Sequence, residues 1–422
     1  MKFIHTADIH LDSPLVGLAA YQDAPAELLR TATRDAFTRL VDEALAESVD
    51  FMVIAGDLYD GGWKDFNTGL FFAREMGRLN KAGIPVYLLF GNHDAESEMT
   101  KKLVLPPNVL AFQTKSAQTY RLESLKVAIH GRSFKDVATT ENLAINYPAY
   151  VEGYLNIGVL HTALEGNAAH ANYAPCSIAE LEAKGYEYWA LGHVHEHKIW
   201  HGKSTVVFPG NLQGRHIREA GPRGAVLVTA EGTEIRSIER LTVDVLRWHA
   251  LEVDVSTAVS LPDAVQQVGQ ALAQVVAEGA EAIPLAVRVT LFGASPAHGE
   301  LFGLEAQLRA EILGLATGMG TDRVWIEKVK VKTQPLQTPE MLAERSDSLA
   351  DLQTLFSQAA SDPGFLAGLA AEFQPLVVKL PLDVINAMPE LKAIRAGDFA
   401  EVLDEVAPGL IAHLASVGGK PA

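Results

Sequence analysis

Phe51-Met52-Val53-Ile54-Ala55-Gly56-Asp57 is an apolar run of strand length that ends at a glycine and then presents a carboxylate. Similar runs in the first half of the chain also end in side chains that can bind metals, at 3–10, 86–94, 155–161 and 188–195. Short apolar strands between helical segments predict a buried sheet, and open α/β sheets bind ligands beyond the carboxyl ends of their strands. We therefore expect an α/β fold in which these strand ends meet at one site.

The side chains at these strand ends are imidazoles, carboxylates and an amide, which together suit divalent metal ions. Mixed nitrogen and oxygen ligands favour manganese, iron or zinc, and the lack of a thiolate set argues against a structural zinc site. Two ions need a shared carboxylate, and Asp57 is the natural bridge. Any single run is more simply an ordinary buried strand with a polar end, but the runs taken together favour a metal centre.

The first run places Asp8 and His10 two residues apart. The alternation of an extended strand would direct both side chains to one side, as two ligands of the same ion. His5 lies within the run, so we interpret it as a core histidine whose hydrogen bonds are satisfied.

The third run ends in Gly91-Asn92-His93-Asp94. Asn92 can offer an amide oxygen to a metal, His93 can handle a proton, and Asp94 can orient an imidazole. A turn alone would explain the glycine and the asparagine but not the two residues that follow. The ends of the last two runs complete the ligand set with His161, His193 and His195.

The composition is that of an ordinary soluble globular protein. A chain of 422 residues with 48% hydrophobic residues suggests two or three domains. The apolar run begins at Phe3 and leaves no room for a signal peptide, and no stretch is long enough to span a bilayer. The single cysteine, Cys176, fits a reducing compartment. We therefore expect a cytoplasmic protein with no membrane association.

The formal net charge of −17 argues against a surface that attracts nucleic acid everywhere, so contact with nucleic acid requires local basic patches. One patch, Arg215 and Arg218, lies in a loop that we expect beside the metals. The other consists of Lys328, Lys330 and Lys332, which share one face of a predicted strand. A solvated edge strand that lysines protect from aggregation is an equally good interpretation of the second patch.

The apolar periodicity predicts three parts. Residues 1–245 contain the metal ligands, and strands near 224–228 and 234–241 are expected to form a second sheet behind the first. Residues 246–335 follow a β-α-β-α-β pattern and form a small α/β domain. Residues 336–422 form a mainly helical tail, with five Lys or Arg against twelve Asp or Glu.

Helical spacing of apolar residues predicts helices near 26–48 and 66–79. In the second helix, the consecutive residues Leu70, Phe71 and Phe72 are too many for one buried stripe. Either this helix is covered on two sides within the chain, or a second copy of the chain covers it in a homodimer.

The motifs Asp8-x-His10, Gly56-Asp57, Gly91-Asn92-His93-Asp94, His161 and Gly192-His193-Val194-His195 follow one another in this order. With this ordered set, the chain resembles the calcineurin-like metallophosphoesterases, and more closely the YhaO-like branch of the SbcD-type DNA repair nucleases. The resemblance implies a two-sheet metallophosphoesterase sandwich flanked by helices, with a small α/β capping domain and a helical C-terminal tail. The motifs cover about the first 220 residues, and the later parts match the layout of the family less specifically.

The resemblance also implies roles for the motif residues. Two divalent ions, usually manganese in this family, would share Asp57, and DNA would be cleaved as a phosphodiester. His93 would assist the transition state and the leaving oxygen. The first ion would be held by Asp8, His10, Asp57 and His195, and the second by Asp57, Asn92, His161 and His193.

Nucleases of this family work with a coiled-coil ATPase of the SMC kind, bound through helices beyond the small domain. The helical tail occupies the corresponding position, so the resemblance implies such an ATPase as a partner. An ordinary helical subdomain packed on its own chain is an equally good interpretation of the tail.

The sequence departs from the better-known nucleases after the bridging aspartate, where Leu58-Tyr59-Asp60 replaces a segment with a histidine, and this leaves the exonuclease polarity open. The favoured function is a manganese-dependent DNA exonuclease or endonuclease in DNA repair, because the later domains exceed what a small phosphatase needs. The alternatives are a phosphoesterase that acts on a nucleotide or phosphoprotein, and a non-catalytic scaffold subunit. The complete ligand set disfavours the scaffold.

Overall fold

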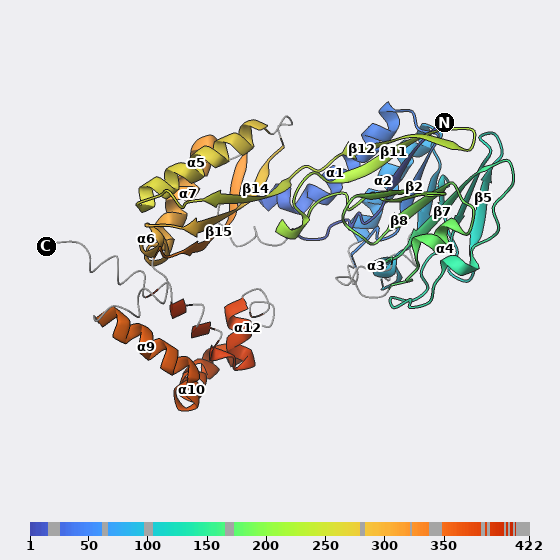
Figure 1. Ribbon diagram of the computed structural model, residues 1–422. Coiled ribbons are helices and arrows are strands. Elements are labelled where there is room, and N and C mark those ends of the chain that lie inside the picture. Colours follow the sequence, from blue (N-terminus) through green and yellow to red (C-terminus); the bar gives the residue numbers. More distant parts are fainter. Residues whose placement is uncertain are drawn as a thin grey trace. The chain divides into compact units, whose positions relative to one another are not determined.

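The computed structural model describes residues 1–15, 26–60, 66–96, 104–164, 173–278, 283–320, 323–336, 348–380, 385, 389–400, 402–403, 406–407 and 410. The chain forms two compact units (Figure 1). The first consists of Met1–His249 with Glu281–Ala286, and the second of Ala250–Ala280 with Val287–Ala422. The domain boundaries predicted near residues 245 and 336 stay predictions.

The first unit contains a six-stranded sheet with the order β12-β11-β1-β2-β3-β4. Strands β1 to β4 are parallel, whereas β11 and β12 are antiparallel to their neighbours. The strands are β1 (Lys2–Thr6), β2 (Phe51–Ala55), β3 (Val86–Leu89), β4 (Val109–Ala111), β11 (Gly224–Glu231) and β12 (Glu234–Thr242).

The expectation that β11 and β12 form a second sheet behind the first was wrong. Strand β11 pairs directly with β1, from Lys2 opposite Thr229 to His5 opposite Val226, so both strands extend the first sheet. Pairing between segments so distant in the sequence leaves no local pattern that could have revealed it.

A second six-stranded sheet has the order β5-β6-β7-β8-β10-β9. Its four inner strands are parallel, and its two edge strands are antiparallel to their neighbours. The strands are β5 (Gln118–Leu122), β6 (Val127–Gly131), β7 (Leu155–His161), β8 (Tyr188–Gly192), β9 (Lys198–His201) and β10 (Thr205–Phe208).

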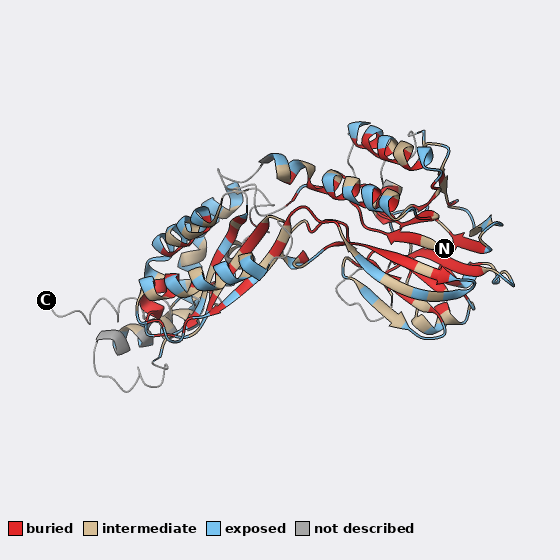
Figure 2. Ribbon diagram, turned by 90° about the horizontal axis from the view of Figure 1, so that it is seen from above, coloured by how far each residue is buried: buried red, intermediate tan, exposed pale blue. Residues whose placement is uncertain are grey.

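The two sheets pack face to face around a shared apolar layer. Phe3 and Phe51 stack with ring centroids 4.9 Å apart, and Tyr188 of the other sheet meets Phe3 edge-on at 5.4 Å. The alternate residues of the first sheet, such as Met52 and Ile54, pack with the helices α1 (Ala26–Ala46) and α2 (Phe66–Lys81). Burial on both faces explains why the strands read as continuous apolar runs (Figure 2).

Helices also cover the outer face of the second sheet, as the predicted sandwich requires. There Trp189 is fully buried and its Nε1–H donates to the carbonyl of Leu181, 3.1 Å away. Ser177 caps the helix to which Leu181 belongs through a reciprocal pair of hydrogen bonds with Glu180. The short helices of this unit are α3 (Asn92–Glu96), η1 (Ala144–Asn146), α4 (Ile178–Glu182) and η2 (Ile217–Glu219).

Helix α2 divides its apolar side chains between the core and the solvent. Phe71 and Phe72 are buried, whereas Phe66 and Leu70 are each 63% exposed. The chain therefore does not cover this helix on two sides at Leu70, and the homodimer contact stays a prediction.

The second unit contains a three-stranded sheet with the order β13-β14-β15. The basic residues Lys328 and Lys332 are exposed and Lys330 is half-buried, and all three lie on the edge strand β15. The elements follow the expected β-α-β-α-β pattern, with the second helix in two pieces: β13 (Arg247–Asp254), α5 (Leu261–Glu278), β14 (Leu285–Ala294), α6 (His298–Gly303), α7 (Glu305–Met319) and β15 (Val324–Gln334).

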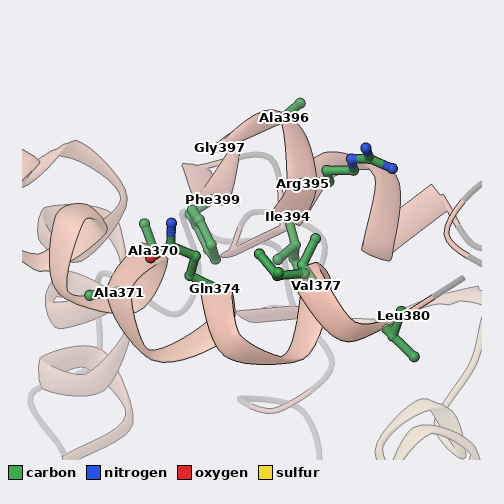
Figure 3. A pocket seen from close by; sticks show the side chains of 11 residues that line it. Ala370, Ala371, Gln374, Val377, Leu380, Ile394, Arg395, Ala396, Gly397 and Phe399 are labelled. Carbon is green, nitrogen blue, oxygen red and sulfur yellow. The ribbon is translucent and has the colours of Figure 1, made fainter. Parts of the chain in front are cut away.

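The tail is helical, as expected, with α9 (Ser348–Ser361), α10 (Pro363–Lys379) and α12 (Pro389–Ala396). Phe373 of α10 meets the buried Phe399 with ring centroids 6.0 Å apart. Beside this contact, α10 and the α12 region line a hollow of about 780 Å³ (Figure 3). No helix among the described residues combines the length and the apolar character needed to cross a membrane.

His5 is a core histidine, as expected. Its ring nitrogens contact the hydroxyl of Tyr188 at 3.0 Å and the carbonyl of Leu191 at 3.1 Å. Burial removes water from the charged form and lowers the pKa of His5 to about 3. In the unfolded chain, the pKa of a histidine is about 6.5. As the pH falls from about 6.5 toward 3, His5 therefore binds a proton in the unfolded chain but stays neutral in the folded chain. Stability that depends on neutral His5 is present above that window and lost within it.

We expect His5→Gln to be less stable than the parent protein at pH 8 by about 1–3 kcal/mol, because buried hydrogen bonds are lost. The difference should shrink as the pH falls to about 4, because glutamine takes up no proton on unfolding. Urea unfolding of both proteins between pH 4 and pH 8 measures the difference. A difference that stays constant across this range would contradict the prediction.

Candidate metal centre

The predicted ligands come together where strands of both sheets end. Among the described residues, three groups of side chains have ligand atoms within 4.8 Å of one another: a first group of Asp8, His10 and His195, a second of Asp57, His161 and His193, and a third of His10, Asp60 and His93. Asp57 links the first two groups, because its Oδ2 is 4.0 Å from His10 Nε2 and 3.4 Å from His161 Nε2. This position suits a bridging carboxylate.

Strand alternation is not what places Asp8 and His10. Strand β1 ends at Thr6, and Asp8 and His10 adopt left-handed φ angles of 50° and 46°, as Asp57 does at 51°. Such angles cost about 1–3 kcal/mol each in a non-glycine residue and concentrate at functional sites. Hydrogen bonds from the backbone N–H groups of Asp8 and His10 to the carbonyls of Gly56 and Asp57, both 3.0 Å long, hold the two loops together.

In the first group, His195 is oriented by a carboxylate. Its Nδ1 lies 2.7 Å from Glu219 Oε1. With the Nδ1 proton donated to this carboxylate, Nε2 carries a lone pair, and it faces His10 Nε2 at 3.2 Å and Asp8 Oδ1 at 4.0 Å. Both oxygens of Asp8 accept hydrogen bonds from the backbone N–H of His193, at 3.1 and 2.9 Å.

In the second group, His161 is oriented by the main chain. Its Nδ1 lies 3.0 Å from the carbonyl of Ala55 at the end of β2, so the Nδ1–H donates there. The lone pair of Nε2 then faces two further acceptors, Asn92 Oδ1 at 2.9 Å and Asp57 Oδ2 at 3.4 Å. Three electron-rich atoms at these distances repel one another unless a cation or a proton lies between them. The donor set therefore fits a metal ion.

The pKa shifts have the same electrostatic origin. Burial alone would lower the pKa of His161, but the carboxylate of Asp57 raises it to about 9. Burial would likewise raise the pKa of Asp57, yet the imidazoles of His161 and His10 hold it well below its usual range. Burial raises the pKa of Asp8 to about 6. Buried anions that need nearby positive charge are the setting in which divalent cations bind.

Asp94 ties two of the ligand loops together. Its buried carboxylate accepts hydrogen bonds from the backbone N–H groups of Leu58, Tyr59 and Gly91, at 2.9 to 3.1 Å. The loop after β2 and the loop after β3 are thereby fixed to one another. The part of Asp94 in orienting an imidazole stays a prediction.

His93 is the most exposed histidine of the centre, with 39% of its side chain accessible. Its backbone N–H donates to Asp57 Oδ1 at 3.1 Å, and its Nδ1 lies 3.3 Å from Asp60 Oδ1. The same oxygen of Asp60 is 3.6 Å from His10 Nδ1, and its other oxygen accepts from Ser13 Oγ at 2.8 Å. Asp60, which in the sequence was only a departure from the family pattern, thus stands beside two histidines of the centre.

Sequence reasoning missed Glu219 altogether. Burial would raise the pKa of Glu219, but the hydrogen bond from His195 holds it well below its usual range, so it remains a carboxylate. The residue lies in a loop 24 positions after His195, at no characteristic spacing from any motif. The only signal was an acidic residue within the otherwise basic stretch from Arg215 to Arg223.

The predicted DNA contacts occupy different settings. Arg215 is turned toward the metal centre, where its Nη1 donates to Ser13 Oγ at 3.1 Å and lies 3.9 Å from Asp60 Oδ2. Arg218 is exposed on the same loop. The lysines of β15 belong to the second unit.

Comparisons with known proteins identify the family of the chain. Residues 1–197 match the calcineurin-like phosphoesterase family, and residues 248–334 match the middle domain of the metallophosphoesterase YhaO. A protein named uncharacterized metallophosphoesterase YhaO, from Bacillus subtilis (strain 168), is 33% identical over 300 residues, which are 70% of this chain and 72% of that protein.

Two archaeal relatives named DNA double-strand break repair protein Mre11 are more distant. The Sulfurisphaera tokodaii protein is 25% identical over 265 residues, 60% of this chain and 65% of that protein. The Methanopyrus kandleri protein is 27% identical over 234 residues, 50% of this chain and 48% of that protein. In both cases the match spans less than two thirds of the relative.

We expect Gly56→Ala to weaken metal binding at one of two sites by roughly 10- to 100-fold, the usual effect of losing the partner that orients a ligand. A Cβ at Gly56 would lie 2.3 Å from His161 Nδ1, and the φ of +102° is strained for alanine. The imidazole would have to move and lose its bond to Ala55. Isothermal titration with Mn²⁺ measures the effect.

The matched control for this substitution is Gly77→Ala in α2, where no heavy atom lies within 4 Å of the added Cβ. The control should bind Mn²⁺ like the parent and fold at least as stably, since alanine favours helix. Parental affinity in Gly56→Ala would show that His161 is not held as described.

Proposed function

This chain belongs to the calcineurin-like metallophosphoesterases, in the YhaO branch, and on that basis we propose that it is a manganese-dependent DNA nuclease acting in DNA repair. Membership of the family implies a hydrolase. The proposed reaction is hydrolysis of phosphodiester bonds, as an exonuclease with accompanying endonuclease activity. The observation that carries the proposal is the pair of buried ligand groups joined by Asp57.

The ligands divide between two ions, with Asp57 in both sets. One set consists of Asp8, His10, Asp57 and His195, and the other of Asp57, Asn92, His161 and His193. When bound, the ions would lower the pKa of a water molecule and would stabilise the negative charge that develops on the phosphate. The residues around them keep each imidazole in the tautomer whose lone pair points inward.

His93 is the proposed proton-handling residue. With Nδ1 beside the carboxylate of Asp60, its Nε2 is the nitrogen left to meet the substrate. Its exposure gives a bound phosphate access to it, whereas the metal ligands Asp57 and His161 are buried. Donation of a proton from this ring to the leaving oxygen is general acid catalysis.

DNA is the proposed substrate for two reasons. Two relatives are named DNA double-strand break repair proteins. In addition, the chain carries Arg218 close to the metal centre and a row of lysines on β15, although its formal net charge is −17. Local basic patches on an acidic protein are the pattern expected when a polyanion is bound at particular places.

The proposal extends to protein partners. Phe66 and Leu70 are exposed on α2, where a second copy of the chain would cover them. In the tail, Leu355, Phe365 and Val378 are exposed, and an SMC-like coiled-coil ATPase would cover these apolar side chains.

The decisive experiment incubates the purified chain and Mn²⁺ with labelled single- and double-stranded DNA, beside a small phosphodiester and a nucleotide monoester. The proposal predicts cleavage of DNA that depends on the metal. Cleavage of the monoester alone would favour a nucleotide or phosphoprotein phosphatase. Bound metal with no hydrolysis of any substrate would favour a scaffold subunit.

We expect His93→Ala to keep both ions and to lose about 100- to 10,000-fold in turnover, the usual contribution of a general acid or base. Asp57→Ala should instead lose affinity for the pair of ions. Turnover under saturating Mn²⁺, together with metal titration, separates the two effects. If His93→Ala loses its metal along with its activity, His93 is a ligand and the assignment is wrong.

We expect the triple substitution of Lys328, Lys330 and Lys332 by glutamine to weaken DNA binding and to flatten its salt dependence. Each lost phosphate contact reduces the slope of log K against log salt by roughly 0.9. The control replaces Lys81, Lys115 and Lys203, which are exposed residues of the first unit, and so removes the same charge. An unchanged slope in the β15 variant would favour the alternative interpretation, in which the lysines only protect an edge strand from aggregation.

A further inference from the structure

We propose that Glu219 is a positioning residue of the metal centre, which holds the imidazole of His195 with Nε2 directed at the first ion. This inference rests on the metal centre of the proposed function. It assigns a role to a loop residue that lies outside every sequence motif of the centre.

The contact between the two residues is short and protected. Glu219 is 5% exposed, and its Oε1 lies 2.7 Å from His195 Nδ1. The side chain of His195 is itself 21% exposed, so surrounding atoms alone do not fix its ring. An acceptor at Nδ1 excludes the tautomer that would put a proton on Nε2, the nitrogen that faces His10 and Asp8.

Glu219 is in turn held from several directions. Its Oε2 accepts from the backbone N–H of Arg215 at 2.7 Å and from Asn211 Nδ2 at 3.0 Å. Arg223, which is 7% exposed, donates to the backbone carbonyls of both Glu219 and His195. The ring and the carboxylate that orients it are therefore tied together through their side chains and also through their main chains.

The two ligand groups differ in the kind of acceptor that orients their histidine. His161 donates to the main-chain carbonyl of Ala55 at the end of a buried strand, which no side-chain substitution removes. His195 donates to the side chain of Glu219, the buried last residue of the short helix η2. A carboxylate acceptor also makes an imidazole a stronger ligand than a neutral carbonyl does. We therefore expect the first ion to depend on Glu219 and the second to be insensitive to it.

The test is a double-mutant cycle on Mn²⁺ binding. Calorimetry and electron paramagnetic resonance measure the binding. Glu219→Ala should weaken one of the two sites by roughly 10- to 100-fold and leave the other unchanged. In a His195→Ala background, the same substitution should cause no further loss, because its target is gone. Glu219→Gln keeps the shape, so it serves as the second variant if the alanine protein does not fold.

Glu196→Gln is the matched control, because it removes one negative charge at the residue next to His195. The carboxylate of Glu196 is exposed and pairs with Lys198 at 2.9 Å. This variant should bind both ions like the parent. Thermal unfolding of each metal-free protein reports any general loss of structure.

Three results would overturn the proposal: parental affinity in the Glu219 variants, an equal loss at both sites, or the same loss with and without His195. A parent protein that binds no Mn²⁺ would instead refute the metal centre itself. A parent that binds two ions but leaves DNA intact would refute only the proposed substrate, and the cycle would still report on Glu219.

Discussion

The buried carboxylate of Asp57 is the constraint on which the rest of the first unit depends. Almost no water reaches this side chain, which is 2% exposed, so its charge must be balanced by groups that the fold supplies. His10 comes from the loop after β1 of the first sheet and His161 from the end of β7 in the second, and they lie 4.0 and 3.4 Å from Asp57 Oδ2. The two sheets must therefore end side by side. Their packing buries the apolar core and also brings together the histidines that balance the charge of Asp57.

This arrangement strains the backbone of the ligand loops, and contacts with neighbouring residues offset the strain. Asp8, His10 and Asp57 all adopt left-handed angles, and the hydrogen bonds between their loops compensate. Glycine stands where neighbours approach most closely. A Cβ at Gly91 would lie 2.3 Å from Asp57 Oδ1, and one at Gly192 would lie 2.0 Å from the carbonyl of Ala55. The glycines of the motifs are thus required by the closeness of the ligand loops.

The sequence predicted most elements, and it identified side chains that the structure brings together, because both leave local marks, in apolar periodicity and in polar strand ends. Pairing partners leave no such mark, so the place of β11 beside β1 could not be foreseen. Strand alternation gave the right result for Asp8 and His10 for the wrong reason, since side chains after a strand follow the turn and not the pleat. Glu219 was missed because only the folded loop brings it to His195.

The charge of the centre also bears on the order of binding. Asp57, Asp60 and Glu219 all remain carboxylates, since nearby imidazoles hold their pKa values well below the usual range. A phosphodiester is itself an anion. The three carboxylates therefore repel it as long as imidazoles are the only groups that balance their negative charge. Divalent cations reverse the sign of the local field at close range, where salt screens least. Under the proposed function, the side chains that would bind the ions would therefore also make the binding of a charged phosphate conditional on those ions, before any contact with a base or a sugar.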